Sequence, residues 1–216
     1  MKIVKEGFRN IKFFAFWGIG FFVIGSFFYS AFLLFLAMLS FIFMLFSFYF
    51  FRNPDRKIVA NENEILCPAD GVVMEITEEY NHLLDQNCKV VRVFLSVFNV
   101  HIQRAPIDGK ITYIEYKTGK FLAAMNPRAH IENEQNLVVF QNENPAKKVL
   151  CSQIAGLIAR TIVMWKKEED VLKIGELYGI IKFGSQVDIY MPANVEIKVA
   201  VKQKVCGGLT VLGEWI

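Results

Sequence analysis

The sequence lacks several features that would assign it to a common functional class. Its 216 residues show no excess of one charge, because 24 basic and 21 acidic side chains leave a net charge of only +3. Proteins that bind nucleic acids usually carry a clear basic excess, so the charge balance argues against that class. It has four cysteines without CxxC spacing or nearby histidine pairs, which leaves a structural zinc site unsupported. We therefore expect no metal, and reduced, buried thiols at Cys67, Cys88, Cys151 and Cys206.

Charge is also missing from one long segment near the N-terminus. Residues 13–51 contain no charged side chain, and 16 of the 21 phenylalanines precede Arg52. A single helix over this segment would be about 58 Å long, roughly twice the thickness of a hydrocarbon core. The segment therefore predicts a membrane-anchoring helical hairpin with spans Phe13 to Gly25 and Ala31 to Phe51. Because the first span is short, both a full crossing and a shallow re-entrant hairpin stay open.

Basic residues flank the apolar segment on both sides, and they predict its orientation. Both ends of a hairpin face the same side of the membrane, and positive flanks favour the cytoplasmic side. A cleaved signal peptide is disfavoured because its apolar core would be shorter and no small-residue cleavage site follows. We expect the globular part of the chain on the cytoplasmic side of the cell (inner) membrane. The flanking residues are Lys2, Lys5, Arg9, Lys12, Arg52, Arg56 and Lys57.

The remainder of the chain, residues 52–216, reads as one β-rich domain preceded by the anchor at 1–51. Short apolar runs rich in Val and Ile alternate with Gly, Pro, Asn and Asp, as in all-β folds. The predicted class is therefore mainly β, a compact β-sandwich or barrel-like domain with little helix. Short helical turns are expected at Ser152–Ile158 and Phe121–Met125. Strands are expected at 71–76, 89–96, 110–116, 136–141, 160–165, 178–182, 186–191, 196–201 and 210–215.

Two similar stretches each place an Asp-Gly turn before an alternating strand. They are Pro68-Ala-Asp-Gly-Val-Val-Met-Glu-Ile76 and Pro106-Ile-Asp-Gly-Lys-Ile-Thr-Tyr-Ile114. Asp-Gly is common turn chemistry, and a histidine near a strand is usually structural. If the two hairpins pack as layers, however, Asp70 and His101 would lie at the same end of the sheet.

A third stretch, Phe183-Gly-Ser-Gln-Val-Asp188, interrupts a strand pattern with Gly184-Ser185. The glycine could mark a simple bulge, or it could let the Ser185 hydroxyl reach the carbonyl before it. Ser, His and Asp together are the components of an activated nucleophile. The serine is not in a GxSxG turn, which disfavours ordinary hydrolase chemistry.

The motifs together resemble the short, membrane-anchored form of phosphatidylserine decarboxylase. The resemblance rests on PADG, FNVHIQRAPIDGKI, QIAGLIART and IIKFGSQVDIYMP in that order, and it covers nearly the whole chain. The family's Asn-Glu-Arg-Asn loop is Asn133-Glu-Gln-Asn136 here, so no role of that arginine is carried over to Gln135. The Arg-Asp-Pro-Glu-Arg segment is Arg52-Asn-Pro-Asp-Arg56, a mild change that we expect to leave the chemistry unaffected.

The resemblance implies a self-processing enzyme with a covalent pyruvoyl cofactor. Cleavage between Gly184 and Ser185 would give a β chain, 1–184, and an α chain, 185–216, with Ser185 converted to the pyruvoyl group. The family's catalytic Asp and His fall on Asp70 and His101. The implied reaction converts phosphatidylserine into phosphatidylethanolamine and carbon dioxide through a Schiff base, as a step of phospholipid biosynthesis.

Substrate contacts and alternatives remain open in the sequence. Arg104 and Lys182 flank the predicted catalytic residues and are candidates for binding the substrate phosphate, although basic residues at solvated strand ends are more often without such a role. A membrane-anchored adaptor module without catalysis, a serine hydrolase, or a decarboxylase of an archaeal-type serine phospholipid would also explain parts of the pattern. The expected partners are the bilayer and its phospholipid, with a homo-oligomer left open and nucleic acid not expected.

Overall fold

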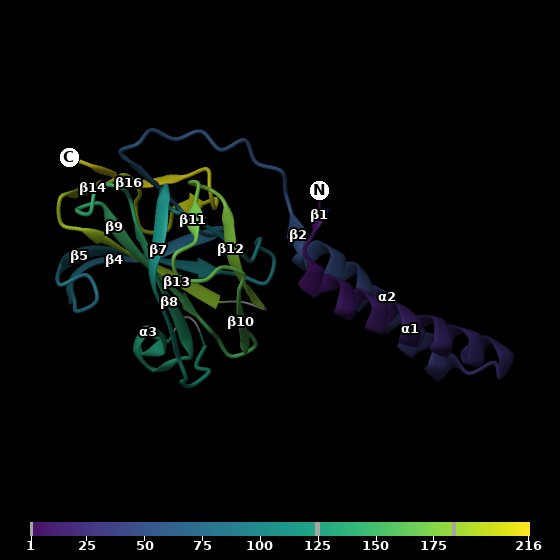
Figure 1. Cartoon of the computed structure of the whole chain (residues 1–216). Coiled ribbons are helices and arrows are strands. Elements are labelled where there is room, and N and C mark those ends of the chain that lie inside the picture. Colours follow the sequence, from purple (N-terminus) through teal and green to yellow (C-terminus); the bar gives the residue numbers. More distant parts are fainter. Residues whose placement is uncertain (1, 124–125, 183–184) are drawn as a thin grey trace. The chain divides into compact units, whose positions relative to one another are not determined.

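A computed structural model describes residues 2–123, 126–182 and 185–216 (Figure 1). The chain divides into two compact units, residues 1–55 and 56–216. The boundary lies four residues after the one predicted from the charge pattern. Each unit is described by itself.

The first unit is a helical hairpin. Helix α1 spans Lys5–Phe27 and α2 spans Ala31–Phe50, and the short strands β1 (Lys2–Ile3) and β2 (Arg52–Asn53) pair next to the hairpin's open end. The Ser30 hydroxyl caps α2 by accepting a hydrogen bond from Leu33 N. Small residues on α1 let the helices approach closely: a Cβ added at Gly25 would lie 3.1 Å from Leu34 N.

Both helices are long and apolar enough to cross a membrane. The helix expected from Ala31 to Phe51 is confirmed within one residue, since α2 ends at Phe50. The first predicted helix, Phe13 to Gly25, was too short, because α1 begins at Lys5 and includes the charged residues before Phe13. A helix of this length is about 34 Å long, although its uncharged part, 13–27, measures only about 22 Å.

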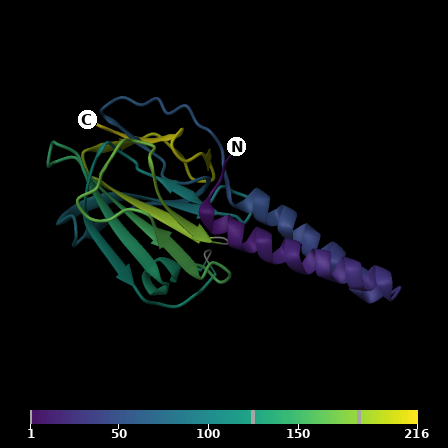
Figure 2. The same ribbon diagram turned by 45° about the vertical axis from the view of Figure 1, so that its right-hand side comes forward.

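The second unit is built on an eight-stranded sheet that curls around one core (Figures 1 and 2). Its strand order is β11-β7-β8-β9-β13-β5-β4-β15, and the neighbouring strands are antiparallel. The bounds are β4 Gly71–Asn81, β5 Gln86–Leu95, β7 Gly109–Lys117, β8 Gln135–Gln141, β9 Lys148–Ile154, β11 Val171–Leu172, β13 Ser185–Pro192 and β15 Lys204–Val205. The barrel-like, mainly β prediction is confirmed by this curled sheet.

Two three-stranded sheets complete the unit, in the orders β10-β12-β6 and β14-β16-β3. A single helical turn, α3 (Ala129–Glu132), lies between β7 and β8 in the chain. The bounds are β3 Glu64–Leu66, β6 Ile102–Arg104, β10 Thr161–Met164, β12 Leu177–Lys182, β14 Val195–Ile197 and β16 Val211–Trp215.

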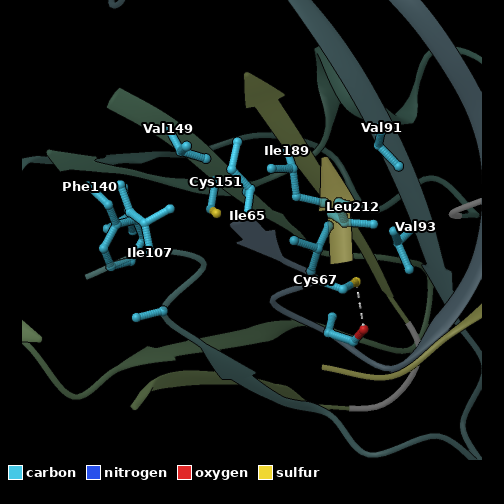
Figure 3. Packing of buried hydrophobic residues seen from close by; sticks show 14 of the residues in the cluster. Ile65, Cys67, Val91, Val93, Ile107, Phe140, Val149, Cys151, Ile189 and Leu212 are labelled. Carbon is cyan, nitrogen blue, oxygen red and sulfur yellow. Dashed lines mark hydrogen bonds between the residues drawn. The ribbon is translucent and has the colours of Figure 1, made fainter. Parts of the chain in front are cut away.

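One face of the large sheet and the two small sheets share a hydrophobic core. On β13, Val187, Ile189 and Met191 point into this core, as the alternating pattern predicted. Figure 3 shows part of the cluster, including Cys67, whose thiol donates a hydrogen bond to Ala69 O at 3.0 Å. Burial raises the pKa of the Cys67 thiol to about 12, which keeps it protonated at neutral pH.

Some local predictions were wrong. Ser152–Ile158 is not helical: its first three residues end β9, where they pair with both β8 and β13. Residues 121–123 form no helix, and 124–125 lie outside the described residues. The buried-thiol prediction holds for three cysteines, but Cys206 is exposed in the turn after β15.

Candidate active site

The strand register brings three predicted functional segments to one end of the large sheet. Ser185, the first residue of β13, pairs with Leu95, the last residue of β5. On the other side of β5, Val72 near the start of β4 pairs with Phe94, so Asp70 directly precedes this paired end. The starts of β4 and β13 therefore flank the end of β5, as antiparallel order requires.

Ser185 is completely buried at this end of β13. Its hydroxyl oxygen has no hydrogen-bond partner within the described part of the chain. A buried hydroxyl without a partner costs free energy, so its placement there calls for a functional reason. Gly184, the other half of the predicted cleavage site, lies outside the described residues.

His101 follows the loop after β5 and is also completely buried. Its Nδ1 lies 3.0 Å from the carbonyl oxygen of Asn99. Its own carbonyl accepts hydrogen bonds from Ile181 N at 3.3 Å and from Gln103 Nε2 at 2.7 Å. Because Ile181 precedes Ser185 by only four residues, these bonds tie His101 to the strand that leads into the predicted cleavage site.

A chain of buried amides extends from the His101 backbone across the core. Gln103 donates to the His101 carbonyl and accepts from Gln153 Nε2 at 2.8 Å. Gln153 in turn accepts from Asn136 Nδ2 at 2.8 Å. These three side chains come from β6, β9 and β8, so the hydrogen-bonded amides connect the small sheet that begins directly after His101 to the large sheet.

Asp70 forms a bidentate ion pair with Arg56. Both guanidinium nitrogens, Nη1 and Nη2, donate to the carboxylate at 2.7 Å, one to each oxygen. The backbone N–H of Gly207 also donates to Asp70 Oδ1 at 2.8 Å. Arg56 additionally donates to the Gly207 carbonyl. This arrangement fixes the orientation of the carboxylate.

Arg104 lies beside the same pair, whereas Lys182 lies at the far end of the neighbouring strand. Arg104 pairs with Leu177, at the start of β12, and Lys182 ends that strand. The Arg104 side chain is almost fully buried and donates to Gly175 O at 3.0 Å. Burial and the neighbouring charge of Arg56 lower the pKa of Arg104. Lys182, at the end of β12, is half-buried and its backbone pairs with Thr161 on β10.

The glycine that follows Gly207 is required by its conformation and its neighbours. Gly208 has φ +75°, in the left-handed region, and a Cβ there would lie 2.8 Å from Arg104 Cδ. The turn between β15 and β16 therefore packs directly against Arg104, next to the Asp70 ion pair.

A second charged cluster lies on the other face of β13. Asp188 is completely buried and accepts a hydrogen bond from Gln186 Nε2 at 2.6 Å, and Arg92 Nε lies 3.3 Å from its second oxygen. Arg92 also pairs with Glu75 and Glu79, at 3.1 and 2.6 Å. Burial raises the pKa of Asp188 to about 7, against the lowering effects of Gln186 and Arg92.

No metal centre is evident in the described ranges, where no three His, Cys, Asp or Glu side chains gather closely enough. The Gln135 side chain forms hydrogen bonds with two uncharged groups: it donates to His130 O and accepts from Ser152 Oγ.

Comparisons with known proteins show to which family the chain belongs. The phosphatidylserine decarboxylase family model matches residues 43–213. The chain belongs to the phosphatidylserine decarboxylase family. Similar relatives, each named phosphatidylserine decarboxylase proenzyme, are 45% identical over 170 residues in Syntrophus aciditrophicus (78% of this chain, 79% of the relative) and 44% identical over 180 residues in Carboxydothermus hydrogenoformans (82% and 84%). A third, from Wolbachia pipientis wMel, is 46% identical over 170 residues (76% and 73%).

Membership of the phosphatidylserine decarboxylase family makes the chain an enzyme and disfavours the adaptor and hydrolase alternatives. Sequence reasoning had given Arg56 a role in membrane orientation alone, and it had given no function to Gln103, Gln153 or Asp188. Arg56 lies in the segment 52–56, where we expected the differences from the family pattern to leave the chemistry unaffected. The fold shows that Arg56 binds Asp70. The glutamines stood inside the recognised motifs, where a buried polar residue on a strand could have signalled them.

Proposed function

We propose that the protein decarboxylates phosphatidylserine to phosphatidylethanolamine and carbon dioxide, using a pyruvoyl group made from its own Ser185. The observation that carries the proposal is the buried Ser185 hydroxyl, which has no hydrogen-bond partner among the described residues. Ser185 is the first residue of β13 and pairs with the last residue of β5. The family of proenzymes supports the reaction class.

The proposed maturation is an internal rearrangement at Gly184-Ser185. His101 takes the hydroxyl proton, and the Ser185 oxygen attacks the Gly184 carbonyl carbon while the peptide C–N bond breaks, giving an ester and a free amine. Loss of the Ser185 α-proton then breaks the ester's Cβ–O bond and leaves a carboxylate on Gly184. Water replaces the nitrogen, which departs as ammonia, and residue 185 becomes the pyruvoyl end of 185–216.

Ser185 suits this role because its environment lacks competing partners. A hydroxyl that donates to no described neighbour is available to a base, and complete burial excludes bulk water from the ester. His101 is buried close to the same chain segment through its bond with Ile181. We assign His101 as the base, with Asp70 orienting it and Arg56 fixing Asp70.

When formed, the pyruvoyl group supplies an electron sink for the electrons that carbon dioxide leaves behind, which no side chain provides. His101 is the residue we assign to deliver a proton to the substrate carbon after carbon dioxide departs. The buried position keeps the proton transfer directed, because solvent cannot compete freely. Arg104 and Lys182 are proposed to bind the substrate phosphate, with Arg104 better placed because it lies beside the Asp70 pair.

The helical hairpin is proposed to anchor residues 52–216 to the cytoplasmic side of the cell membrane. The basic residues on both sides of the apolar segment support this orientation. An anchored enzyme can meet a substrate whose tails remain in the leaflet, and its product then enters phospholipid biosynthesis.

Intact-protein mass spectrometry of the full chain tests maturation. We expect two chains, 1–184 and 185–216, with a keto group and no amine at the N-terminus of the smaller one. Ser185→Ala should remain a single chain, while Ser96→Ala, a matched change at another serine near the end of β5, should be processed. An intact wild-type chain without a keto group contradicts the proposal.

A further inference from the structure

Three large apolar side chains are exposed in the loops that flank the proposed site. Phe98, in the loop after β5, is 63% exposed, and Leu157 and Ile158, in the loop after β9, are 58% and 66% exposed. Strands β5 and β9 are the two neighbours of β13. Because both loops follow the ends that pair with the start of β13, they lie on either side of Ser185.

These loops bury their small apolar residues and expose their large ones. Val100 is 4% exposed and Ala155 and Ala159 are completely buried, in the same two loops as the exposed side chains. Ordinary packing would favour the reverse, since a large side chain gains more by burial than alanine does. Exposed apolar groups gathered at one end of a protein usually mark an interaction surface.

The two loops carry one charged residue, the basic Arg160. Neither 96–100 nor 155–160 contains an acidic residue. Arg160 is exposed at the end of the second loop, with its Cζ 5.4 Å from the centre of the Phe121 ring. Lys182 pairs with Thr161, the residue after Arg160. An apolar tip with neighbouring basic side chains is complementary to an anionic lipid surface.

We propose that Phe98, Leu157, Ile158 and Arg160, together called the apolar rim, insert into an anionic phospholipid surface at the end of the large sheet where Ser185 lies. The proposal rests on the proposed function, because it gives the lipid head group a route to a buried site without leaving the leaflet. The apolar side chains enter the interfacial region, and Arg160 contacts phosphate and carboxylate groups there. This contact is separate from the helical hairpin, which anchors the chain whether or not the rim inserts.

A fluorescence experiment tests insertion directly. The exposed Cys206 is changed to Ser in the full chain, and single cysteines Phe98→Cys, Leu157→Cys and Val171→Cys carry an environment-sensitive dye. Val171 is the matched control: it is 73% exposed, but its strand β11 pairs with the start of β7, at the opposite end of the sheet. The chains are reconstituted in vesicles of phosphatidylcholine and phosphatidylglycerol, which the proposed reaction does not consume.

Spin-labelled lipids should quench the dye at positions 98 and 157 and leave the dye at position 171 unquenched. Replacing phosphatidylglycerol by phosphatidylcholine should weaken the quenching, and Arg160→Gln should weaken it in the anionic vesicles. Equal quenching at all three positions, or none above the Val171→Cys control, overturns the proposal.

An activity ratio provides the second measurement. The triple change Phe98→Asp, Leu157→Asp and Ile158→Asp should lower the rate on phosphatidylserine in vesicles, relative to the rate on dissolved short-chain phosphatidylserine, by about tenfold or more. Val171→Asp should leave the ratio unchanged. An unchanged ratio in the triple variant overturns the apolar rim. Absence of decarboxylation in the wild type on both substrates overturns the proposed function instead. The quenching result then determines whether the apolar rim inserts into lipid.

Discussion

Arg56 binds both carboxylate oxygens of Asp70, and each of the two contacts measures 2.7 Å. The two side chains are 8% and 13% exposed, so the pair is largely removed from water. A guanidinium is planar and matches a carboxylate in two bonds at once, whereas an ammonium group cannot. The pair therefore orients Asp70, rather than only balancing its charge.

Replacing Arg56 should slow maturation. In Arg56→Lys the carboxylate keeps a positive neighbour but loses the second bond, and in Arg56→Ala it loses both. We expect cleavage slower by about 10- to 100-fold in Arg56→Ala, with Arg56→Lys between it and the wild type. The measurement is the fraction of newly synthesised chain cleaved against time. Arg128→Ala, which removes an exposed arginine paired with Glu132, is the control; wild-type kinetics in Arg56→Ala would contradict the assignment.

Replacing His101 should stop cleavage altogether if it is the base. We expect His101→Ala to accumulate as an uncut chain in intact-protein mass spectra, because no other group is assigned to remove the Ser185 proton. His82→Ala changes a histidine outside the proposed site and should be processed normally. Cleavage of His101→Ala at the wild-type rate would exclude His101 from this step.

Breaking the buried amide chain should destabilise the second unit. Gln103→Met has a similar shape but leaves the His101 carbonyl and the Gln153 amide each without a bond to residue 103. The His101 carbonyl keeps its hydrogen bond from Ile181 N, so the Gln153 amide is the buried group that loses its acceptor, and we expect the free energy of unfolding to fall by about 1–3 kcal/mol. Denaturant titration in detergent measures this change, with Gln141→Met, at the half-buried end of β8, as the control.

The same experiment can show that the amides act together. Gln103→Met and Gln153→Met remove neighbouring links of one chain, so the double variant should lose less stability than the sum of the two single losses. Additive losses would mean that the two glutamines stabilise the protein independently.

The buried Asp188 should make stability depend on pH. Its folded pKa, about 7, lies above its ordinary value of 3.8, so between these values the folded protein binds a proton that the unfolded chain does not. The contribution of Asp188 to the free energy of unfolding therefore falls as pH rises from 4 to 7, by up to about 1.4 kcal/mol per pH unit.

Asp188→Asn should remove this slope, so the variant gains stability relative to the wild type as pH rises through that range. Glu143→Gln, at an exposed carboxyl group, should retain the wild-type slope. Parallel pH profiles for Asp188→Asn and the wild type would show that the carboxyl is ionised throughout the range.

The sequence predicted the class of the fold and the chemistry-bearing segments because both depend on local patterns. Alternation along residues 186–191 identified β13 and its core-facing side, and the uncharged run identified the hairpin. The helix predicted at Ser152–Ile158 failed because β9 is paired on both sides, so tertiary pairing determines a conformation that the local pattern leaves open.

The contacts between distant residues could not be predicted in the same way. Arg56 and Gly207 both reach Asp70, from positions 14 residues before it and 137 residues after it. Nothing in the spacing of those residues connects them. Likewise, the link from Asn136 to the His101 carbonyl requires the relative placement of three strands.

The central position of β13 determines what the proposed cleavage would do to the fold. β13 hydrogen-bonds to β5 on one edge and to β9 on the other, while β15 pairs with β4 and β16 with β3. A cut before Ser185 would release no peptide, because residues 185–216 supply the central strand β13 and the edge strand β15 of the large sheet, and two strands of the small sheet β14-β16-β3. The two products would remain associated in one fold. They would co-migrate under native conditions and separate only when the sheet unfolds.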